Sequence, residues 1–277
     1  MRIAVLADIH GNLAAFHAAL AAAKREAPDL LVIAGDVVNG APDSRACWQL
    51  ARAEADVLLR GNHERYVLDR GTPEGDPRWL GTRFRPIAWA RSEVEDLLDE
   101  LRACPIAVPL APDVLLMHAA PTDDHVSLYP WTDDGTLERV LDPAPEALLV
   151  RAHNHLPFHR VLADGRLLVS VGAVGLALVG RPEAQFGLLT SSARRGWTVR
   201  HVSLPYDVDA TLARFVDTGY LREAGPMAHV FRREIATGSH HLVPFVRFEQ
   251  RWRREHGVQG DDEAALERAL RAFLALD

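Results

Sequence analysis

The chain has 277 residues and a mass of 30.6 kDa, of which 48% are hydrophobic and 25% charged. This composition is that of an ordinary globular protein, and it excludes a disordered chain, a collagen-like repeat and a disulfide-built scaffold. The formal net charge of −7 argues against sequence-independent binding to nucleic acid, which needs a basic surface. We therefore expect no nucleic-acid duplex as a partner.

The sequence indicates a protein of the reducing cytosol. Its two cysteines, Cys47 and Cys104, are expected to be buried thiols, because disulfides are rare in that compartment. No apolar stretch reaches the ~18 residues of a membrane span. The apolar run at 2–7 is too short for a signal peptide and ends at a carboxylate. We expect a cytoplasmic protein with no membrane partner.

Strands and helices alternate over the first 60 residues. Short continuous apolar runs predict buried strands at 2–7, 30–34 and 57–59, and apolar residues at helical spacing predict helices at 13–27 and 44–54. Such alternation is typical of an α/β fold.

The middle of the chain is mostly strand. Repeated glycines and prolines predict a long loop at 71–90, and a helix is expected at 92–102 with Ser92 as its N-cap. Asp164-Gly165 predicts a two-residue hairpin turn. The strands expected here are 106–110, 113–117, 148–152, 159–163, 166–171, 174–179, 186–191 and 198–204.

Helix returns from residue 207 onward, ending in an amphipathic helix at 261–276. No repeat or linker divides the chain, so we expect a single domain over 1–277, with 226–277 as a helical C-terminal extension. The apolar face of the last helix either closes the fold or forms a dimer contact, and the sequence leaves the oligomeric state open.

Polar side chains follow directly on five of the apolar runs. Ligands bind beyond the carboxyl ends of strands in open α/β sheets, so we expect these side chains to converge. Carboxylates and imidazoles suit manganese, iron, zinc or nickel. A pair of divalent metal ions is therefore predicted, with Asp36 suited to bridge them. The residues in question are Asp8, His10, Asp36, Asn62, His63, His118, His153 and His155.

These residues also form an ordered set of short motifs, which resembles the motif set of the calcineurin-like metallophosphoesterase superfamily. Within that superfamily the chain is similar to the small bacterial and archaeal phosphodiesterases, over about residues 1 to 220. The motifs are Asp8-Ile9-His10, Gly35-Asp36, Gly61-Asn62-His63-Glu64, the lone His118 and Ala152-His153-Asn154-His155.

The resemblance implies a four-layer α/β/β/α sandwich and a specific site. His63 would be the catalytic general acid and would not bind metal. Mn²⁺ is favoured, and Fe, Zn or Ni would suit the same donors. One ion would be held by Asp8, His10, Asp36 and His155, and the other by Asp36, Asn62, His118 and His153.

The chain departs from the family pattern at three places. Ala152 stands where glycine is usual, and Asn154 where threonine is usual. The serine/threonine protein phosphatases carry Gly-Asp-x-x-Asp-Arg-Gly, whereas this chain reads Gly35-Asp36-Val37-Val38-Asn39-Gly40. It lacks there both the aspartate that orients the catalytic histidine and the arginine that grips phosphate. Protein phosphatase activity is therefore the less favoured reading.

The sequence thus predicts a metal-dependent phosphodiesterase that hydrolyses a small phosphate ester, such as a nucleotide, with a hydroxide bridging two metals. A phosphomonoesterase or nucleotidase would use the same metal core. A non-enzymatic interaction scaffold is less favoured, because every ligand position and His63 are retained.

Three side-chain roles stay open at this point. Asn12 either caps the helix that begins at residue 13 or contacts the substrate. Glu64 either serves as a carboxylate in the first turn of a helix or orients the site. Tyr129 and Trp131 either stack against a nucleobase or pack in the interior.

Overall fold

Two five-stranded sheets form the centre of the computed structural model, which describes residues 1–193 and 196–275. The first sheet has the order β10-β9-β1-β2-β3, and the second has the order β4-β5-β6-β8-β7. The strands are β1 (Arg2–Leu6), β2 (Leu30–Ala34), β3 (Val57–Leu59), β4 (Ala107–Ala111), β5 (Val114–Met117), β6 (Leu148–Arg151), β7 (Pro157–Val161), β8 (Leu167–Val171), β9 (Ala184–Ser192) and β10 (Gly196–Leu204).

Each sheet is mixed and contains three neighbouring parallel strands. In the first sheet β1, β2 and β3 are parallel to one another, and β9 runs antiparallel to both of its neighbours, β1 and β10. In the second sheet β5, β6 and β8 are parallel to one another. The two sheets pack face to face through apolar side chains from both, among them Val5, Val32, Leu116, Val150 and Leu189. Burial on both faces explains why the parallel strands read as continuous apolar runs.

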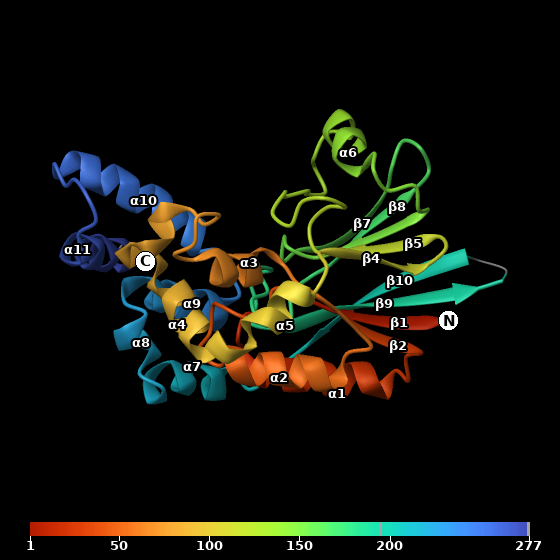
Figure 1. Cartoon of the computed structure of the whole chain (residues 1–277), viewed down its shortest axis with the longest axis horizontal. Helices are drawn as coiled ribbons and strands as arrows, with labels where there is room; N and C mark the ends of the chain where they lie inside the picture. Colours follow the sequence, from red (N-terminus) through yellow and green to blue (C-terminus); the bar gives the residue numbers. More distant parts are fainter. Residues whose placement is uncertain (194–195, 276–277) are drawn as a thin grey trace.

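Helices cover the two outer faces, which makes the four layers that the resemblance implied (Figure 1). Helices α1 (Leu13–Arg25) and α2 (Ser44–Glu54) pack against the first sheet through Phe16, Leu20 and Trp48. Helix α6 (Asp134–Leu141) packs against the second sheet through Leu137 and Leu141. The α/β/β/α sandwich is confirmed.

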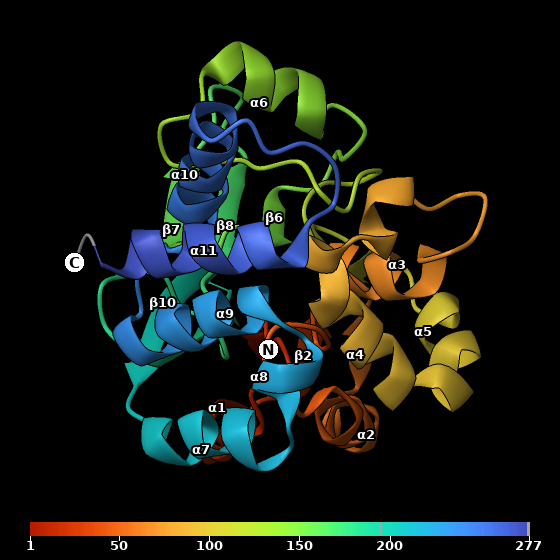
Figure 2. The ribbon, with the colours of Figure 1, turned by 90° about the vertical axis from the view of Figure 1, so that its left-hand side faces the viewer.

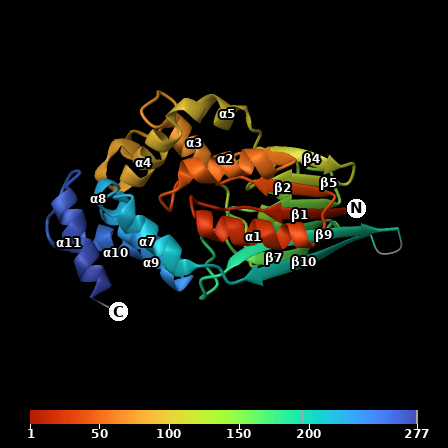
Figure 3. The same cartoon turned by 90° about the horizontal axis from the view of Figure 1, so that it is seen from below.

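Most of the remaining helices, α4 and α7 to α11 among them, gather at one end of the sandwich, away from the N-terminus (Figures 2 and 3). Within that group α7, α8 and α9 share one apolar cluster, and α9, α10 and α11 share another. The bounds of all remaining α-helices are α3 (Asn62–Asp69), α4 (Arg85–Glu93), α5 (Leu98–Ala103), α7 (Val208–Asp217), α8 (Tyr220–Glu223), α9 (Pro226–Thr237), α10 (Leu242–Glu255) and α11 (Glu263–Leu274). The assignment of 1–277 to a single domain stays a prediction.

The prediction of a long loop at 71–90 is wrong. This segment contains two 3₁₀ helices (Pro77–Leu80 and Thr82–Phe84) and most of α4. Pro86 lies in the first turn of α4, where its missing N–H costs nothing, so proline here begins a helix. Ser92 is accordingly not an N-cap; it lies in the last turn of α4 and donates a hydrogen bond to the Trp89 carbonyl.

Two further expectations are wrong. Residues 174–179 form no strand; Val174 and Gly175 instead donate backbone hydrogen bonds to the carbonyls of Ala7 and Asp8. A Cβ on Gly175 would lie 1.8 Å from the Ile9 carbonyl oxygen, so the close approach of the two backbones needs glycine. The turn at Asp164-Gly165 belongs to a five-residue connection, 162–166, between β7 and β8.

The helix predicted at 92–102 is shorter in the structure, where a 3₁₀ helix (Glu95–Leu97) precedes α5 (Leu98–Ala103). The other predicted boundaries agree with the structure to within a few residues. Cys47 and Cys104 are buried free thiols and form no disulfide with each other. Among the described residues, no helix combines the length and the apolar character needed to cross a bilayer.

Candidate metal centre

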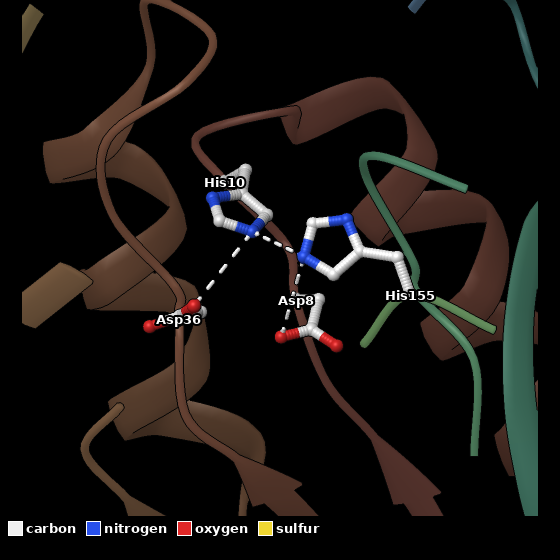
Figure 4. A group of neighbouring side chains, drawn as sticks. All are labelled: Asp8, His10, Asp36 and His155. Carbon is white, nitrogen blue, oxygen red and sulfur yellow. Dashed lines mark hydrogen bonds and ion pairs between the residues drawn. The ribbon is translucent and has the colours of Figure 1, made fainter. Parts of the chain in front are cut away.

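The predicted site residues meet where strands of both sheets end. Residues following β1, β2 and β6 form one group of potential ligands, Asp8, His10, Asp36 and His155, whose donor atoms lie within 4.8 Å of one another (Figure 4). Residues following β2, β5 and β6 form a second group, Asp36, His118 and His153, to the same limit. Asp36 belongs to both groups.

The backbone is strained at these positions. Five of the seven described non-glycine residues with positive φ are predicted ligands: Asp8, His10, Asp36, His153 and His155, with φ between 51° and 71°. Residues other than glycine rarely adopt positive φ, and those that do are concentrated at functional sites. Ala152, which replaces the usual glycine, is not among them, so its position tolerates a Cβ.

Backbone carbonyls orient the two histidines of the first group. His10 Nδ1 lies 2.8 Å from the Asn39 carbonyl oxygen, and His155 Nδ1 lies 2.8 Å from that of Leu176. Since a carbonyl only accepts, each Nδ1 carries the hydrogen and each Nε2 presents a lone pair. These two Nε2 atoms lie 3.0 Å apart. Two nitrogen lone pairs that face each other repel, and a cation bound by both nitrogens would relieve that repulsion.

The second group repeats this arrangement. His118 Nδ1 lies 2.7 Å from the Ala34 carbonyl oxygen, which leaves Nε2 facing Asp36 Oδ2 at 3.4 Å. Asn62 Oδ1 lies 3.0 Å from His118 Nε2 and 2.8 Å from His153 Nδ1. With its amide turned over, Asn62 would donate to both rings instead. The side chain can thus serve a metal-free site as a donor and a metal-bound site as an oxygen ligand.

Burial makes the charges of this site costly without a counter-ion. Burial raises the pKa of Asp8 well above its usual value, although the charge of His118 opposes the shift. Burial lowers the pKa of His10 and His155. Asp36 overcomes the effect of burial on His118 and raises the pKa of that ring to about 9. Buried carboxylates and imidazoles held this closely fit divalent cations, which compensate such charges.

Glu64 holds the loop that carries Asp36. It is fully buried, and its two carboxylate oxygens accept backbone hydrogen bonds from four residues, namely Asp36 (2.9 Å), Val37 (2.7 Å), Val38 (3.1 Å) and Gly61 (2.6 Å). The last of these satisfies the N-terminus of α3. Glu64 therefore both lies in the first turn of a helix and orients the site.

His63 is placed beside the ligands but is held by Asn39. Its backbone N–H donates to Asp36 Oδ1 at 2.8 Å, and its Nδ1 lies 3.0 Å from Asn39 Nδ2. An amide donor there makes Nδ1 the acceptor and leaves the hydrogen on Nε2. Burial lowers the pKa of His63 to about 3, although the charge of Asp36 opposes the shift. The ring is therefore neutral in the free protein.

Asn12 is the N-cap of α1. Its Oδ1 accepts hydrogen bonds from the Ala15 backbone and the Thr211 hydroxyl, and its Nδ2 donates to the Gly175 carbonyl and the Tyr206 hydroxyl. The side chain is fully buried and does not line the cavity described below. All four of its bonding positions are used within the protein, so we propose no substrate contact for Asn12.

Sequence reasoning missed Arg151, a fully buried cation at the end of β6. Its guanidinium donates to the carbonyls of Ala119 (2.8 Å), Leu128 (2.8 Å) and Val126 (3.0 Å), and to Asn154 Oδ1. Asn154 also accepts from the Leu128 backbone at 3.2 Å. These two residues hold the segment 119–128 against the site. The sequence feature that could have revealed this role is an arginine at the end of an otherwise apolar strand.

A cavity of about 420 Å³ opens beside the potential ligands. His63, Ser127 and His153 line it on the ligand side, and Tyr129 lines it as well. Ser127 Oγ lies 3.3 Å from His153 Nε2. Trp131 is 73% exposed and stacks in parallel on Tyr129, with ring centroids 5.0 Å apart. The interpretation that Trp131 packs in the interior is therefore wrong.

The donor set, the shared Asp36 and the adjacent cavity define a candidate metal centre. Comparison with known proteins shows the family to which the chain belongs. The model of the calcineurin-like phosphoesterase family matches residues 1–173, and the chain belongs to that family. The family implies a metal-dependent hydrolase acting on phosphate esters.

Individual relatives are distant. The chain is 22% identical over 232 residues, 77% of its length, to an uncharacterized protein of Methanocaldococcus jannaschii, of which the match covers 91%. It is 35% identical over 77 residues, 27% of its length, to serine/threonine-protein phosphatase 1 of Salmonella typhimurium, and spans only 36% of that protein. A metallophosphoesterase structure from Sphaerobacter thermophilus superposes with a TM-score of 0.66 at 23% identity, covering 86% of this chain and all of that one. This structure supports the fold.

Proposed function

We propose that the protein is a dinuclear metal-dependent phosphodiesterase acting on a small phosphate ester. The observation that carries this proposal is the pair of ligand groups that share Asp36. Asp8, His10 and His155 complete one ion site; Asn62, His118 and His153 complete the other. Nitrogen and oxygen donors without a thiolate suit Mn²⁺, which we favour, and also suit Fe, Zn or Ni.

Two such cations, when bound, lower the pKa of water and neutralise charge on the phosphoryl oxygens. Hydrolysis would join the oxygen of a water to phosphorus and break the phosphorus–oxygen ester bond opposite it. The water would lose a proton to solvent, and the leaving oxygen would take one from His63. His63 lines the cavity, and its Nε2–H is the donor that the leaving oxygen meets. A bound phosphate brings negative charge next to this ring, which favours the protonated imidazole that a general acid requires.

The surroundings of His63 support a diester over a monoester. Asn39, an uncharged amide, contacts the ring where the protein phosphatases have aspartate. Arg83, the one arginine among the described residues lining the cavity, is in an ion pair with the buried Glu249. A monoester dianion would benefit from a free cation, whereas a diester carries a single negative charge.

The test is hydrolysis of bis-p-nitrophenyl phosphate beside p-nitrophenyl phosphate by protein stripped of metal and refilled with Mn²⁺. We expect faster turnover of the diester, loss of activity on stripping, and loss in His63→Ala with metal still bound. Faster turnover of the monoester would establish the phosphatase or nucleotidase alternative instead. Turnover of neither substrate by the metal-loaded protein would favour the scaffold.

A further inference from the structure

The cavity beside the metal centre has a second wall that the family motifs do not supply. This wall comes from the segment before α4 and the first turn of α4, from the loop after β8, and from α9 and α10, which belong to the C-terminal helices. It is apolar: the side chains that matter here are Phe84, Ile87, Leu178, Met227, Phe231 and Val243. The volume of about 420 Å³ lies within the range of small-molecule pockets.

The two polar groups of this wall that could carry a full charge, Arg83 and Glu234, are already engaged within the protein, and burial lowers the pKa of the third, His240. Arg83 pairs with Glu249, which is fully buried and also pairs with Arg253. Glu234 Oε1 accepts backbone hydrogen bonds from His241 at 2.8 Å and Leu242 at 2.7 Å, and thereby holds the start of α10. Among the cavity-lining residues in the described part of the chain, no arginine or lysine is free to bind a second anion.

We propose that the substrate carries an uncharged, apolar organic group on its phosphate, and that this group lies on the wall formed by α9, α10 and the segment before α4. The inference rests on the proposed function, since it takes the phosphate to sit at the metal centre. The cavity is continuous from His63 and His153 to Phe231 and Val243, so one ester can occupy both ends. Polyphosphates and acidic peptides are disfavoured, because their additional charges meet no free arginine or lysine among the described residues that line the cavity.

The proposal makes a quantitative prediction for alkyl esters. Burying one CH₂ group changes affinity by roughly three- to fourfold. We therefore expect kcat/KM to rise by about that factor for each added CH₂ until the wall is covered, and then to level off.

The experiment uses the Mn²⁺-loaded full chain and a series of 4-nitrophenyl alkyl phosphodiesters with methyl, butyl and octyl groups. These esters share one leaving group, so differences in kcat/KM report the alkyl end. A rise from methyl to octyl is expected, and a flat series would overturn the inference while leaving the proposed function standing. Hydrolysis of no member would refute the proposed function and, with it, the inference.

Two variants assign the effect to the wall. Val243 is 48% exposed and Leu178 half-buried, so replacing either with serine is compatible with folding. We expect Val243→Ser and Leu178→Ser each to lower the octyl-to-methyl ratio of kcat/KM by about fivefold. Val216→Ser, at a helical valine that is 60% exposed and does not line the cavity, is the matched control and should leave the ratio unchanged. Equal ratios in all four proteins would overturn the assignment to this wall.

A charged ester provides the second arm. 4-Nitrophenyl 4-carboxybutyl phosphate resembles the butyl ester but ends in a carboxylate. We expect its kcat/KM to be at least tenfold lower than that of the butyl ester. A higher value would show that the wall takes an anionic group and would overturn the inference.

Discussion

The Nε2 atoms of His10 and His155 lie 3.0 Å apart, and each ring is fixed by a hydrogen bond from its Nδ1 to a backbone carbonyl. Neither ring can turn its lone pair away without leaving that carbonyl unsatisfied. Backbone hydrogen bonds of this kind orient the histidine ligands of metal sites. The arrangement therefore predicts the effect of removing one ring.

His155→Gln should reduce the metal content from two ions per chain to one, because the remaining donors of the second group are intact. Asp36→Asn should remove both ions, since Asp36 belongs to both groups. Metal analysis after dialysis measures this directly. His159→Gln is the control, because His159 is an exposed histidine outside either group. Two ions retained in Asp36→Asn would contradict the shared ligand.

Glu64→Gln should destabilise the protein by roughly 3 kcal/mol. One glutamine oxygen replaces two carboxylate oxygens, so two of the four buried N–H groups that Glu64 satisfies lose their acceptor. Urea unfolding measures the change. Glu95→Gln, at an exposed glutamate, should stay within about 0.5 kcal/mol of the parent. Equal stabilities of the two variants would refute the anchoring role.

Gly61→Ala should abolish metal binding. An alanine Cβ would lie 2.3 Å from Asp36 Oδ1 and 2.6 Å from His118 Nε2, so both ligands would have to move. The matched control is Gly135→Ala in α6, where the added Cβ meets one atom at 3.5 Å and alanine favours the helix. Titration with Mn²⁺ compares the two variants. Wild-type affinity in Gly61→Ala would show that the spacing of this centre is looser than we infer.

Glu234 should make stability depend on pH. Burial raises its pKa from 4.5 to about 7, so the folded protein holds a proton that the unfolded chain has lost. The contribution is fully present below pH 4.5 and is lost as the pH rises through 7, by up to about 3 kcal/mol. The difference in unfolding free energy between wild type and Glu234→Gln should therefore fall across this range. A difference that does not change with pH would contradict the assignment.

The strand ends of the site could be predicted from sequence because parallel strands buried on both faces are continuous apolar runs, and the polar residue after each run marks where it ends. Asp8, Asp36 and His118 were found this way, without any knowledge of long-range contacts. Which metal ion each of them binds came only from the resemblance and stays a proposal.

The rest depends on contacts between distant parts of the chain. The run at 174–179 is as apolar as a strand, yet Gly175 packs against the Ile9 carbonyl and the segment becomes a loop beside the site. The apolar wall is assembled from α9 and α10 and from residues near Phe84, which precede these helices by more than a hundred residues in the sequence. No local pattern reveals that these segments meet.

The most direct test of the central claim is the anomalous scattering of crystals grown with Mn²⁺. We predict two peaks about 3.5–4 Å apart, both within coordination distance of the Asp36 carboxylate, one beside His10 and His155 and the other beside His118 and His153. A single peak, or two peaks of which only one contacts Asp36, would contradict the dinuclear centre on which the proposed function rests.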